Sequence, residues 1–338
     1  MDALKPLIKI ISDGQAMSYD QARRAFEIML NGEATPGQIG SVLTGLRVRG
    51  ETREELLAGA EIMRRYALGV DAPEGALDTC GTGGDGSGTY NISTAVSFVL
   101  AGAGVPVAKH GNRALSSKSG SSEVLESLGV RLDLTPEQIS TCIHQTGMGF
   151  MFAPAHHSAM KHVGAVRVEL GIKTIFNLLG PLSNPAGTKY HLMGVYDAAW
   201  VEVMAETLHA LGSLRAWVVH GSDGLDEITT TGPTKVAVLE DGAVKVMEIS
   251  PADAGLPVAR PEDLTGGTPD ENAAALRDLL TGAPSAYRDI VVFNAAAGLI
   301  VAGKAADLKT GADMAAAAID DGHALHALDS LVKVSNNV

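Results

Sequence analysis

The sequence predicts an α/β protein in two parts: a small all-helical domain, then a large α/β domain with a central, mostly parallel sheet. Three observations lead to this prediction. Helix-start patterns repeat through the first 70 residues, short apolar runs alternate with amphipathic segments from Ala76 onward, and one hairpin pattern indicates an antiparallel edge. A chain of 338 residues is also long enough for two domains that share an interface.

The N-terminal segment carries three capping boxes, in which a hydroxyl residue at the helix start is followed three residues later by Gln or Glu. They are Ser18 with Gln21, Thr35 with Gln38, and Thr52 with Glu55. Each precedes apolar residues at helical spacing, and Gly32 and Gly50 fall where helices would end. We therefore expect short helices joined by tight turns, whose apolar faces pack within the chain or against a second subunit.

From Ala76 the sequence predicts parallel strands, most of them followed by helices. The expected strands cover residues 76–80, 105–108, 150–152, 192–195 and 216–219. A hairpin over residues 236–239 and 244–249 turns at Asp241-Gly242, a strong hairpin dipeptide, so the sheet is mixed at one edge. Residues 251–270 are rich in Pro, Gly and Asp and predict a loop, after which we expect three alanine-rich helices.

Composition argues against several classes of function. The formal net charge is −13 and no Lys/Arg-rich run occurs, so we expect no nucleic-acid partner. Two cysteines, Cys80 and Cys142, cannot form a disulfide framework or a multi-cysteine zinc site. We expect no signal peptide and no membrane span, because the longest apolar run, residues 95–108, is short and broken by glycine. The sequence therefore predicts a soluble cytoplasmic protein.

The stretch from Gly81 to Thr94, GTGGDGSGTYNIST, is the strongest functional signal. It contains G-x-G-x-x-G, but a dinucleotide-binding fold needs an acidic residue about 20 residues further on, where this chain has Lys109 and His110. A P-loop is excluded because no Gly-Lys-Ser/Thr ends the loop. What remains is a glycine turn leading into a helix near Asn91, whose free N–H groups and dipole favour an oxyanion. An ordinary structural turn does not account for the run of glycines.

Two more polar clusters lie at predicted strand ends, where open α/β sheets bind ligands. We interpret the first, Lys109-His110-Gly111-Asn112-Arg113 with Lys118 in the polar loop beyond it, as an anion-binding segment rather than solvated surface charge. The second holds the adjacent acids Asp226 and Glu227. They fit Mg²⁺, which often bridges one or two carboxylates to substrate phosphates. On that element alone, a solvated acidic turn is equally consistent.

Together these segments resemble the anthranilate phosphoribosyltransferase family over nearly the whole chain. The motifs that carry the resemblance are Gly81-Thr82-Gly83-Gly84-Asp85, Asn91-Ile92-Ser93-Thr94, Lys109-His110-Gly111-Asn112-Arg113, Ser116-Ser117-Lys118-Ser119-Gly120-Ser121, Phe152-Ala153-Pro154, Arg167 with Leu170-Gly171, Thr174-Ile175-Phe176-Asn177-Leu178-Leu179-Gly180-Pro181-Leu182, and Gly224-Leu225-Asp226-Glu227.

The resemblance implies transfer of the 5-phosphoribosyl group from phosphoribosyl pyrophosphate to the amine of anthranilate, with Mg²⁺. The products would be N-(5-phosphoribosyl)anthranilate and pyrophosphate, in a step of tryptophan biosynthesis. It also implies the fold of the nucleoside phosphorylase/phosphoribosyltransferase class. The helical domain would comprise residues 1–73 with part of 167–190 and form a homodimer, and the α/β domain would comprise residues 74–166 and 191–338.

The site residues that the resemblance implies fall into three sets. Phosphoribosyl pyrophosphate would be bound by Gly81, Gly83, Gly84, Asp85, Thr89, Asn91, Ser93, Thr94, Lys109 and Ser121. Anthranilate would be bound by Gly81, His110, Asn112, Pro154, His157 and Arg167, with His156 as the alternative to His157. Mg²⁺ would be bound by Ser93, Asp226 and Glu227. No dedicated acid or base is expected, because the anthranilate amine is already a nucleophile.

Two alternatives stay open, a different transferase of the same fold and a noncatalytic relative. A pyrimidine nucleoside phosphorylase of the same fold would use phosphate as acceptor, and a test with thymidine and phosphate separates the two activities. A noncatalytic relative that binds nucleic acid would carry a basic face and could lack Arg167 or the acidic pair. This chain is acidic and keeps Arg167, Asp226 and Glu227.

Overall fold

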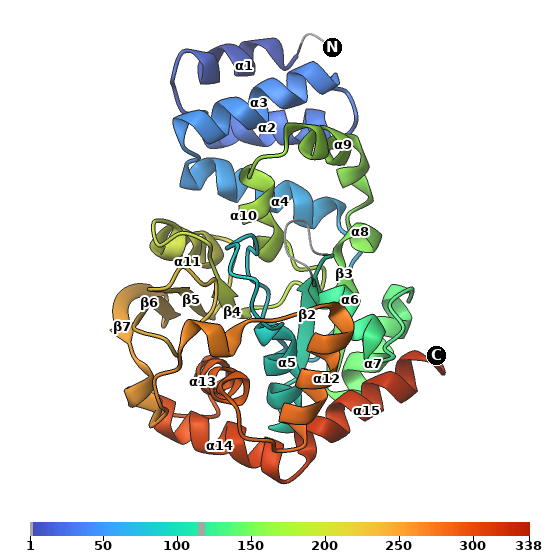
Figure 1. Cartoon of the computed structure of the whole chain (residues 1–338). Helices are drawn as coiled ribbons and strands as arrows, with labels where there is room; N and C mark the ends of the chain where they lie inside the picture. The colour runs from blue at the N-terminus through green and yellow to red at the C-terminus, as the bar shows by residue number, and fades with distance from the viewer. Residues whose placement is uncertain (1–2, 114–118) are drawn as a thin grey trace. The chain divides into compact units, whose positions relative to one another are not determined.

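The computed structural model describes residues 3–113 and 119–338 and divides the chain into two compact units (Figure 1). The helical unit comprises Met1–Leu68 and Pro154–Gly187, and the α/β unit comprises Gly69–Ala153 and Thr188–Val338. The helical unit thus includes residues 154–166, which the sequence assigned to the larger domain. The Ser116-Ser117-Lys118 part of the predicted anion-binding loop lies outside the described residues.

The helical unit begins with the short helices that the sequence predicts. Its elements are α1 (Lys5–Ser12), α2 (Tyr19–Leu30), α3 (Pro36–Arg49), α4 (Arg53–Tyr66), α8 (Ala153–His156), the 3₁₀ turn η1 (Ser158–Met160), α9 (Lys161–Leu170) and α10 (Ile175–Leu182). All three capping boxes are confirmed, since Ser18, Thr35 and Thr52 each accept the N–H of the residue three positions on.

The core of the helical unit joins its two chain segments. Helix α4 packs on α2 and α10, and α3 packs on α1 and α9. Phe26 of α2 meets Phe176 of α10 edge to face, with ring centroids 5.8 Å apart. A Cβ at Gly59 of α4 would lie 2.8 Å from a Leu179 side-chain atom and 2.9 Å from one of Phe26. This glycine therefore lets α4 approach both partners.

One carboxylate, that of Glu55, is fully buried inside the helical unit. It accepts the backbone N–H of Met17 at 3.0 Å and that of Thr52 at 2.9 Å, and it pairs with Arg49. The Glu55 carboxylate therefore caps the N-terminus of α4. It also neutralises the guanidinium of Arg49, whose side chain is only 12% exposed.

The α/β unit is built on one mixed sheet. Its strands are β1 (Leu77–Asp78), β2 (Val107–Gly111), β3 (Met148–Phe152), β4 (Tyr190–Gly194), β5 (Arg215–Gly221), β6 (Thr234–Glu240) and β7 (Ala243–Ile249). The described strands follow the order β3-β2-β1-β4-β5-β6-β7. Neighbours from β3 to β5 are parallel, whereas β6 and β7 are antiparallel. The predicted hairpin is confirmed, with Asp241 and Gly242 at φ 51° and 73° in its two-residue turn.

Most strand boundaries differ by a few residues from those predicted, and two of the differences concern the candidate site. Strand β1 stops at Asp78, whose Oδ1 accepts the N–H of Cys80 at 3.1 Å and turns the backbone away from the ladder. Strand β2 continues to Gly111, because Lys109 and His110 pair with β3 along its full length. The sequence analysis placed these two polar residues just beyond the end of a strand, but in the structure they lie inside it.

The remaining helices surround the sheet. They are α5 (Ile92–Gly102), α6 (Ser121–Ser127), α7 (Pro136–Thr146), α11 (Trp200–Ala210), α12 (Pro269–Leu280), α13 (Ala286–Val301), α14 (Leu308–Asp320) and α15 (His323–Ser335). Four helices follow residue 268, so the prediction of three was wrong. Gly322, at φ 76°, separates α14 from α15 by a single left-handed turn. The predicted loop over residues 251–270 also holds two 3₁₀ turns, η2 (Pro251–Ala254) and η3 (Pro261–Leu264).

Helix α5 is enclosed on most of its surface. It contacts α13, α14 and α15 as well as β2 and β3, which explains why its sequence is apolar nearly all round. A Cβ at Gly102 would lie 2.6 Å from the Ala324 backbone nitrogen, so α5 and α15 meet backbone to backbone. In the described part of the chain, neither this helix nor any other is long and apolar enough to cross a membrane.

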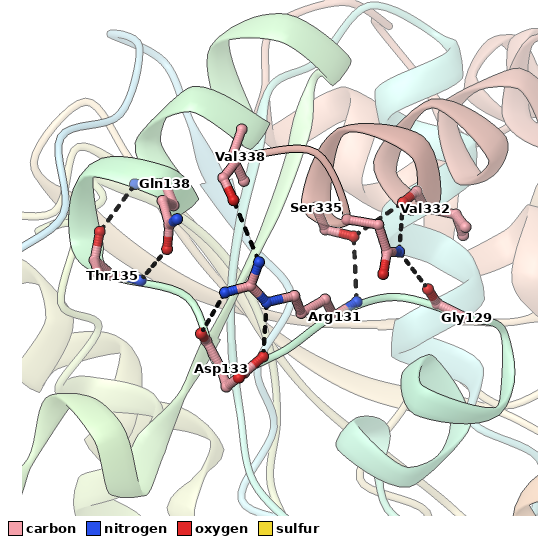
Figure 2. Close-up of polar contacts among 9 residues, drawn as sticks. Gly129, Arg131, Asp133, Thr135, Gln138, Val332, Ser335 and Val338 are labelled. Atoms are coloured by element: carbon pink, nitrogen blue, oxygen red, sulfur yellow. Dashed lines mark hydrogen bonds and ion pairs between the residues drawn. The ribbon is translucent and has the colours of Figure 1, made fainter.

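The end of α15 is fastened to the segment that connects α6 and α7, as Figure 2 shows. The Arg131 N–H donates to Ser335 Oγ at 3.2 Å, and its guanidinium donates to the Val338 carbonyl oxygen at 3.2 Å. The same guanidinium pairs with Asp133 at 2.9 Å. Arg131 therefore links the last turn of the chain to the body of the α/β unit.

Candidate active site

The order of the parallel strands identifies where a ligand would bind. Strands β2 and β3 lie on one side of β1, and β4 and β5 lie on the other side. The direction in which successive strands are added therefore changes between β1 and β4. Ligands of open α/β sheets bind outside the carboxyl ends of the strands at such a point. The glycine loop, residues 81–90, leaves β1 there. Its Thr82 N–H donates to the Gly194 carbonyl oxygen at the end of β4, at 2.9 Å.

The shape of the glycine loop depends on its glycines. Gly83, Gly84, Gly86 and Gly88 have φ values of 64°, 73°, 76° and 64°. This left-handed region is open to glycine and strained for most other residues. Between them, the Asp85 carboxylate turns back to accept the Ser87 N–H at 3.2 Å and its hydroxyl at 2.7 Å. The loop therefore presents backbone rather than bulky side chains to a ligand.

The loop leads into the N-terminus of α5, as predicted. Thr94, in the first turn of α5, is 1% exposed, and its hydroxyl has no hydrogen-bond partner among the described residues. A buried hydroxyl without a partner costs about 1–3 kcal/mol. A ligand oxygen at this helix end would remove that cost, so Thr94 agrees with an anion site.

Lys109 is buried, at 2% exposure, and does not project into solvent. Its ammonium donates to the Thr79 carbonyl oxygen at 3.3 Å, to Thr79 Oγ1 at 3.2 Å and to Ser93 Oγ at 3.2 Å. Thr79 Oγ1 in turn lies 2.9 Å from Ser97 Oγ. The ammonium of Lys109 therefore lies below the first turn of α5. Its contact with the candidate site is the hydrogen bond to Ser93.

Asp78 and Thr79 are site residues that the sequence analysis missed. Asp78 is 1% exposed, and its Oδ1 accepts the N–H of Cys80 and that of His110, both at 3.1 Å. It therefore joins the end of β1 to the middle of β2. A buried acid in an apolar strand was the available signal, but the residues that it contacts are distant in the sequence.

The predicted metal pair lies against the glycine loop and α5. Asp226 Oδ2 accepts the Gly83 N–H at 2.7 Å, and Glu227 Oε1 accepts the Ser93 N–H at 3.2 Å. Burial raises the pKa of the Asp226 carboxyl, and the nearby Asp85 raises it further. Burial and the charge of Asp226 likewise raise the pKa of Glu227. The structure thus brings three carboxylates together beside amides predicted to bind phosphate.

Close backbone approach sets the position of the acidic pair. A Cβ at Gly194 would lie 1.5 Å from the Asp226 carbonyl oxygen, and a Cβ at Gly81 would lie 2.8 Å from Asp226 Oδ2. Beyond the pair, the Asn294 amide exchanges two hydrogen bonds with the backbone of Ile228, at 2.9 and 2.8 Å. The geometry therefore requires glycine at position 194, and a side chain at position 81 would displace the Asp226 carboxylate.

The donor chemistry of the pair fits Mg²⁺. The described residues contain no group of three or more His, Cys, Asp or Glu side chains arranged to hold a metal ion. Two carboxylates are nevertheless a normal Mg²⁺ set, since this ion keeps several positions for water and substrate phosphates. A cation would also relieve the repulsion that raises the pKa values of Asp226 and Glu227.

Residues predicted to bind anthranilate are divided between the two units. Gly81, His110 and Asn112 belong to the α/β unit, whereas Pro154, His157 and Arg167 belong to the helical unit. His110 is 3% exposed, and Asn112 is exposed. Each unit therefore supplies part of the predicted set.

Arg167 is a half-buried cation of α9. Its guanidinium lies over the Phe176 ring, 5.5 Å from the centroid, and reaches Asn177 Oδ1 at 3.5 Å. Burial lowers the pKa of this group. Within the described residues it forms no ion pair with a carboxylate, which leaves its charge available to an anionic ligand.

The two neighbouring histidines are both buried. His156 Nδ1 lies 2.8 Å from the Leu68 carbonyl oxygen, so His156 ties α8 to the end of the α4 segment. His157 is 5% exposed and borders a cavity of about 10 Å³ with apolar side chains that include Met63 and Met160. Burial lowers the pKa of His157 to about 4, so the ring is neutral at pH 7. Its contact with anthranilate stays a prediction.

Comparison with family models defines the class of protein. Residues 73–325 match the model described as "Glycosyl transferase family, a/b domain", and residues 5–67 match "Glycosyl transferase family, helical bundle domain". The chain is a transferase of this two-domain class.

The relatives are more specific. An anthranilate phosphoribosyltransferase of Azorhizobium caulinodans is 60% identical over 99% of this chain and 97% of its own length. Among solved structures, the anthranilate phosphoribosyltransferase of Thermus thermophilus is 40% identical with a TM-score of 0.92, covering 99% of this chain and 100% of its own. The Saccharomyces cerevisiae enzyme in complex with PRPP and Mg is 28% identical with a TM-score of 0.88, covering 99% and 98%. This chain belongs to the anthranilate phosphoribosyltransferase family.

Proposed function

We propose that this protein transfers the 5-phosphoribosyl group from phosphoribosyl pyrophosphate to the amine of anthranilate, releasing pyrophosphate, in tryptophan biosynthesis. The observation that carries the proposal is the glycine loop at the switch point between β1 and β4. It opens onto the N-terminus of α5, with Lys109 beneath and Asp226 and Glu227 beside it. These are the groups that a pyrophosphate ester with a divalent cation requires.

The reaction builds positive charge on the ribose ring and negative charge on the departing pyrophosphate. The N–H groups of the loop and of α5, together with the Ser93 and Thr94 hydroxyls, would hold the phosphates in place. Lys109 adds a fixed positive charge behind Ser93. Catalysis would then come from orientation and electrostatics, and the anthranilate amine would need no dedicated base.

Mg²⁺ would be held by Asp226 and Glu227, with Ser93 assisting. When bound, it would neutralise charge on the pyrophosphate. The two carboxylates accept the Gly83 and Ser93 N–H groups, so they also orient the backbone that faces the substrate. The other residues assigned to phosphoribosyl pyrophosphate by resemblance are Gly81, Gly84, Asp85, Thr89, Asn91 and Ser121.

Arg167 would bind the anthranilate carboxylate, because a guanidinium can grip a carboxylate with two parallel hydrogen bonds. Its half-buried position and the absence of an ion pair within the described residues support this role. The resemblance also assigns His110, Asn112, Pro154 and Gly81 to anthranilate, with His157 as a further candidate.

A homodimer through the helical unit is part of the proposal. Val48 of α3 and Val168 of α9 are 82% and 79% exposed, and these two helices pack on each other. Apolar side chains this exposed on neighbouring helices support a contact with a second copy of the chain. Val48→Asp with Val168→Asp should shift the sedimentation coefficient to that of a monomer. A cytoplasmic location stays a prediction that rests on the low cysteine content.

The test is the loss of anthranilate fluorescence on adding phosphoribosyl pyrophosphate and Mg²⁺, with each component omitted in turn. We expect turnover in the complete mixture only. A parallel reaction with thymidine and phosphate tests the nucleoside phosphorylase alternative. Turnover in that reaction alone would overturn the proposed function.

A further inference from the structure

The glycine loop is paired with a segment far along the chain, residues 264–272. The Gly266 N–H donates to the Gly88 carbonyl oxygen at 2.9 Å, and the Tyr90 N–H donates to the Leu264 carbonyl oxygen at 3.2 Å. A Cβ at Gly266 would lie 2.6 Å from a carbonyl oxygen of the loop. The last part of the glycine loop is therefore held along its backbone by residues that the sequence placed in an ordinary loop.

Asn272, in the first turn of α12, closes this segment. Its side chain is buried, at 1% exposure. Its Oδ1 accepts the Gly267 N–H at 2.7 Å, and its Nδ2 donates to Asn91 Oδ1 at 2.9 Å. A carboxamide can accept on one side and donate on the other without a charge. One side chain thus joins residues 264–272 to the start of α5.

Asn91, which directly precedes α5, is held from three directions. Besides Asn272, its side chain exchanges two hydrogen bonds with Ser119, at 3.2 and 3.3 Å. Its carbonyl oxygen accepts the Tyr287 hydroxyl at 3.1 Å. The Tyr287 ring also stacks on Tyr90, with centroids 4.3 Å apart and planes 15° apart. The Asn91 side chain makes no capping bond to α5, so its polar contacts serve these neighbours.

We infer that Asn272 and Tyr287 are positioning residues for phosphoribosyl pyrophosphate, acting through Asn91. The inference rests on the proposed function of the glycine loop and α5. A loop with so many glycines loses much conformational entropy when a ligand orders it. Asn272 and Tyr287 fix its far end in the folded protein, so that this part of the loop is already ordered before the substrate binds. Neither residue is required to touch the substrate.

The main test compares Asn272→Leu with Tyr287→Phe. Asn272→Leu removes both amide contacts, and we expect KM for phosphoribosyl pyrophosphate to rise about tenfold, with KM for anthranilate changed by less than about twofold. Tyr287→Phe keeps the ring stack and removes one hydroxyl, so we expect a rise of about threefold. Calorimetric titration of each variant with phosphoribosyl pyrophosphate and Mg²⁺, without anthranilate, should show the same loss in affinity.

A double-mutant cycle tests whether Asn272 acts through Asn91. In an Asn91→Ala background, adding Asn272→Leu should change the affinity for phosphoribosyl pyrophosphate by less than about twofold, because the contact is already lost. Full additivity of the two changes would overturn the inference. If Asn272→Leu does not fold, Asn272→Asp, which keeps the acceptor for Gly267, takes its place in the cycle.

A control must separate positioning from loss of stability. Ser335→Ala removes a buried hydroxyl that accepts from Arg131 at the end of α15 (Figure 2). It should lower the unfolding midpoint without changing KM for phosphoribosyl pyrophosphate. If Asn272→Leu and Tyr287→Phe behave like this control, the inference is wrong while the wild-type activity stands. If the wild-type protein neither binds phosphoribosyl pyrophosphate nor consumes anthranilate, the proposed function itself has failed.

Discussion

Two carboxylate sites, one in each unit, are balanced in different ways. In the helical unit, Glu55 accepts two backbone N–H groups and pairs with Arg49. In the α/β unit, Asp226 and Glu227 each accept one N–H group and lie beside each other and Asp85, and their pKa values are raised by burial and by that negative charge.

The difference indicates what each site is for. A buried carboxylate with a guanidinium and two amides is balanced inside the protein and supports the fold. A partly buried carboxylate that faces other carboxylates is destabilising until a cation arrives, which is typical of a functional site. Glu55 should therefore matter for stability alone, and Asp226 for activity at some cost in stability.

Glu55→Ala should have the largest effect. It leaves Arg49 without its carboxylate and two backbone N–H groups without an acceptor, so we expect the free energy of unfolding to fall by about 3–5 kcal/mol. Urea denaturation measures this loss. The neighbouring exposed Glu54→Ala should change stability by less than about 0.5 kcal/mol. If kcat/KM of the folded Glu55→Ala variant falls more than about twofold, the assignment of Glu55 to stability alone is wrong.

Asp226→Asn should show the opposite pattern. The amide oxygen can still accept the Gly83 N–H, but the charge for the cation is gone, so we expect kcat/KM to fall roughly 10²- to 10³-fold. The unfolding midpoint without Mg²⁺ should rise, because the change removes a charge that opposes folding. Differential scanning fluorimetry and steady-state kinetics measure the two effects. A lower unfolding midpoint with unchanged kcat/KM would mean that Asp226, like Glu55, supports the fold and not the activity.

Arg167→Ala asks whether the helical unit also contributes to binding. We expect KM for anthranilate to rise roughly 10- to 100-fold, since a hydrogen bond to a charged group is lost, while KM for phosphoribosyl pyrophosphate stays within about twofold. Arg167→Lys should restore part of the loss, because an ammonium keeps the charge without the planar fork. The control is Arg23→Ala in a surface pair with Glu27. Equal, small changes in both KM values would remove Arg167 from the site.

Added Mg²⁺ should have the smallest effect. Binding to the folded protein alone should raise the free energy of unfolding by about 1–3 kcal/mol at saturating concentrations, and a chelator should reverse the change. The increase should be absent in Asp226→Asn and present in Glu55→Ala. An equal increase in both variants would place the cation elsewhere.

Local patterns predicted much of the fold. The capping boxes at Ser18, Thr35 and Thr52 are contained within four residues each, and the Asp241-Gly242 turn within two, so the sequence carries their full signal. The short left-handed turn at Gly322 was harder to predict. The alanine-rich pattern continues on both sides of it, so the sequence does not show the break between α14 and α15.

The candidate site was less predictable wherever its partners are distant in the chain. Lys109 was expected as an anion ligand at a strand end, but Thr79 and Ser93, on other elements, hold it within the core. Asn272 lies 181 residues after Asn91, and no local pattern connects them. Residue types and spacing therefore indicated which chemistry is present, whereas the hydrogen-bond partners emerge only from the fold.

The hairpin at the edge of the sheet has a practical consequence. Asp241 and Gly242 are exposed at the tip between β6 and β7, and both have left-handed backbone conformations. The outer strand β7 is also largely exposed, with Lys245 and Glu248 among its solvent-facing side chains. Loop tips of this kind accept inserted sequence. A fluorescent label or affinity tag placed between residues 241 and 242 would give a reporter on this protein without altering either chain terminus.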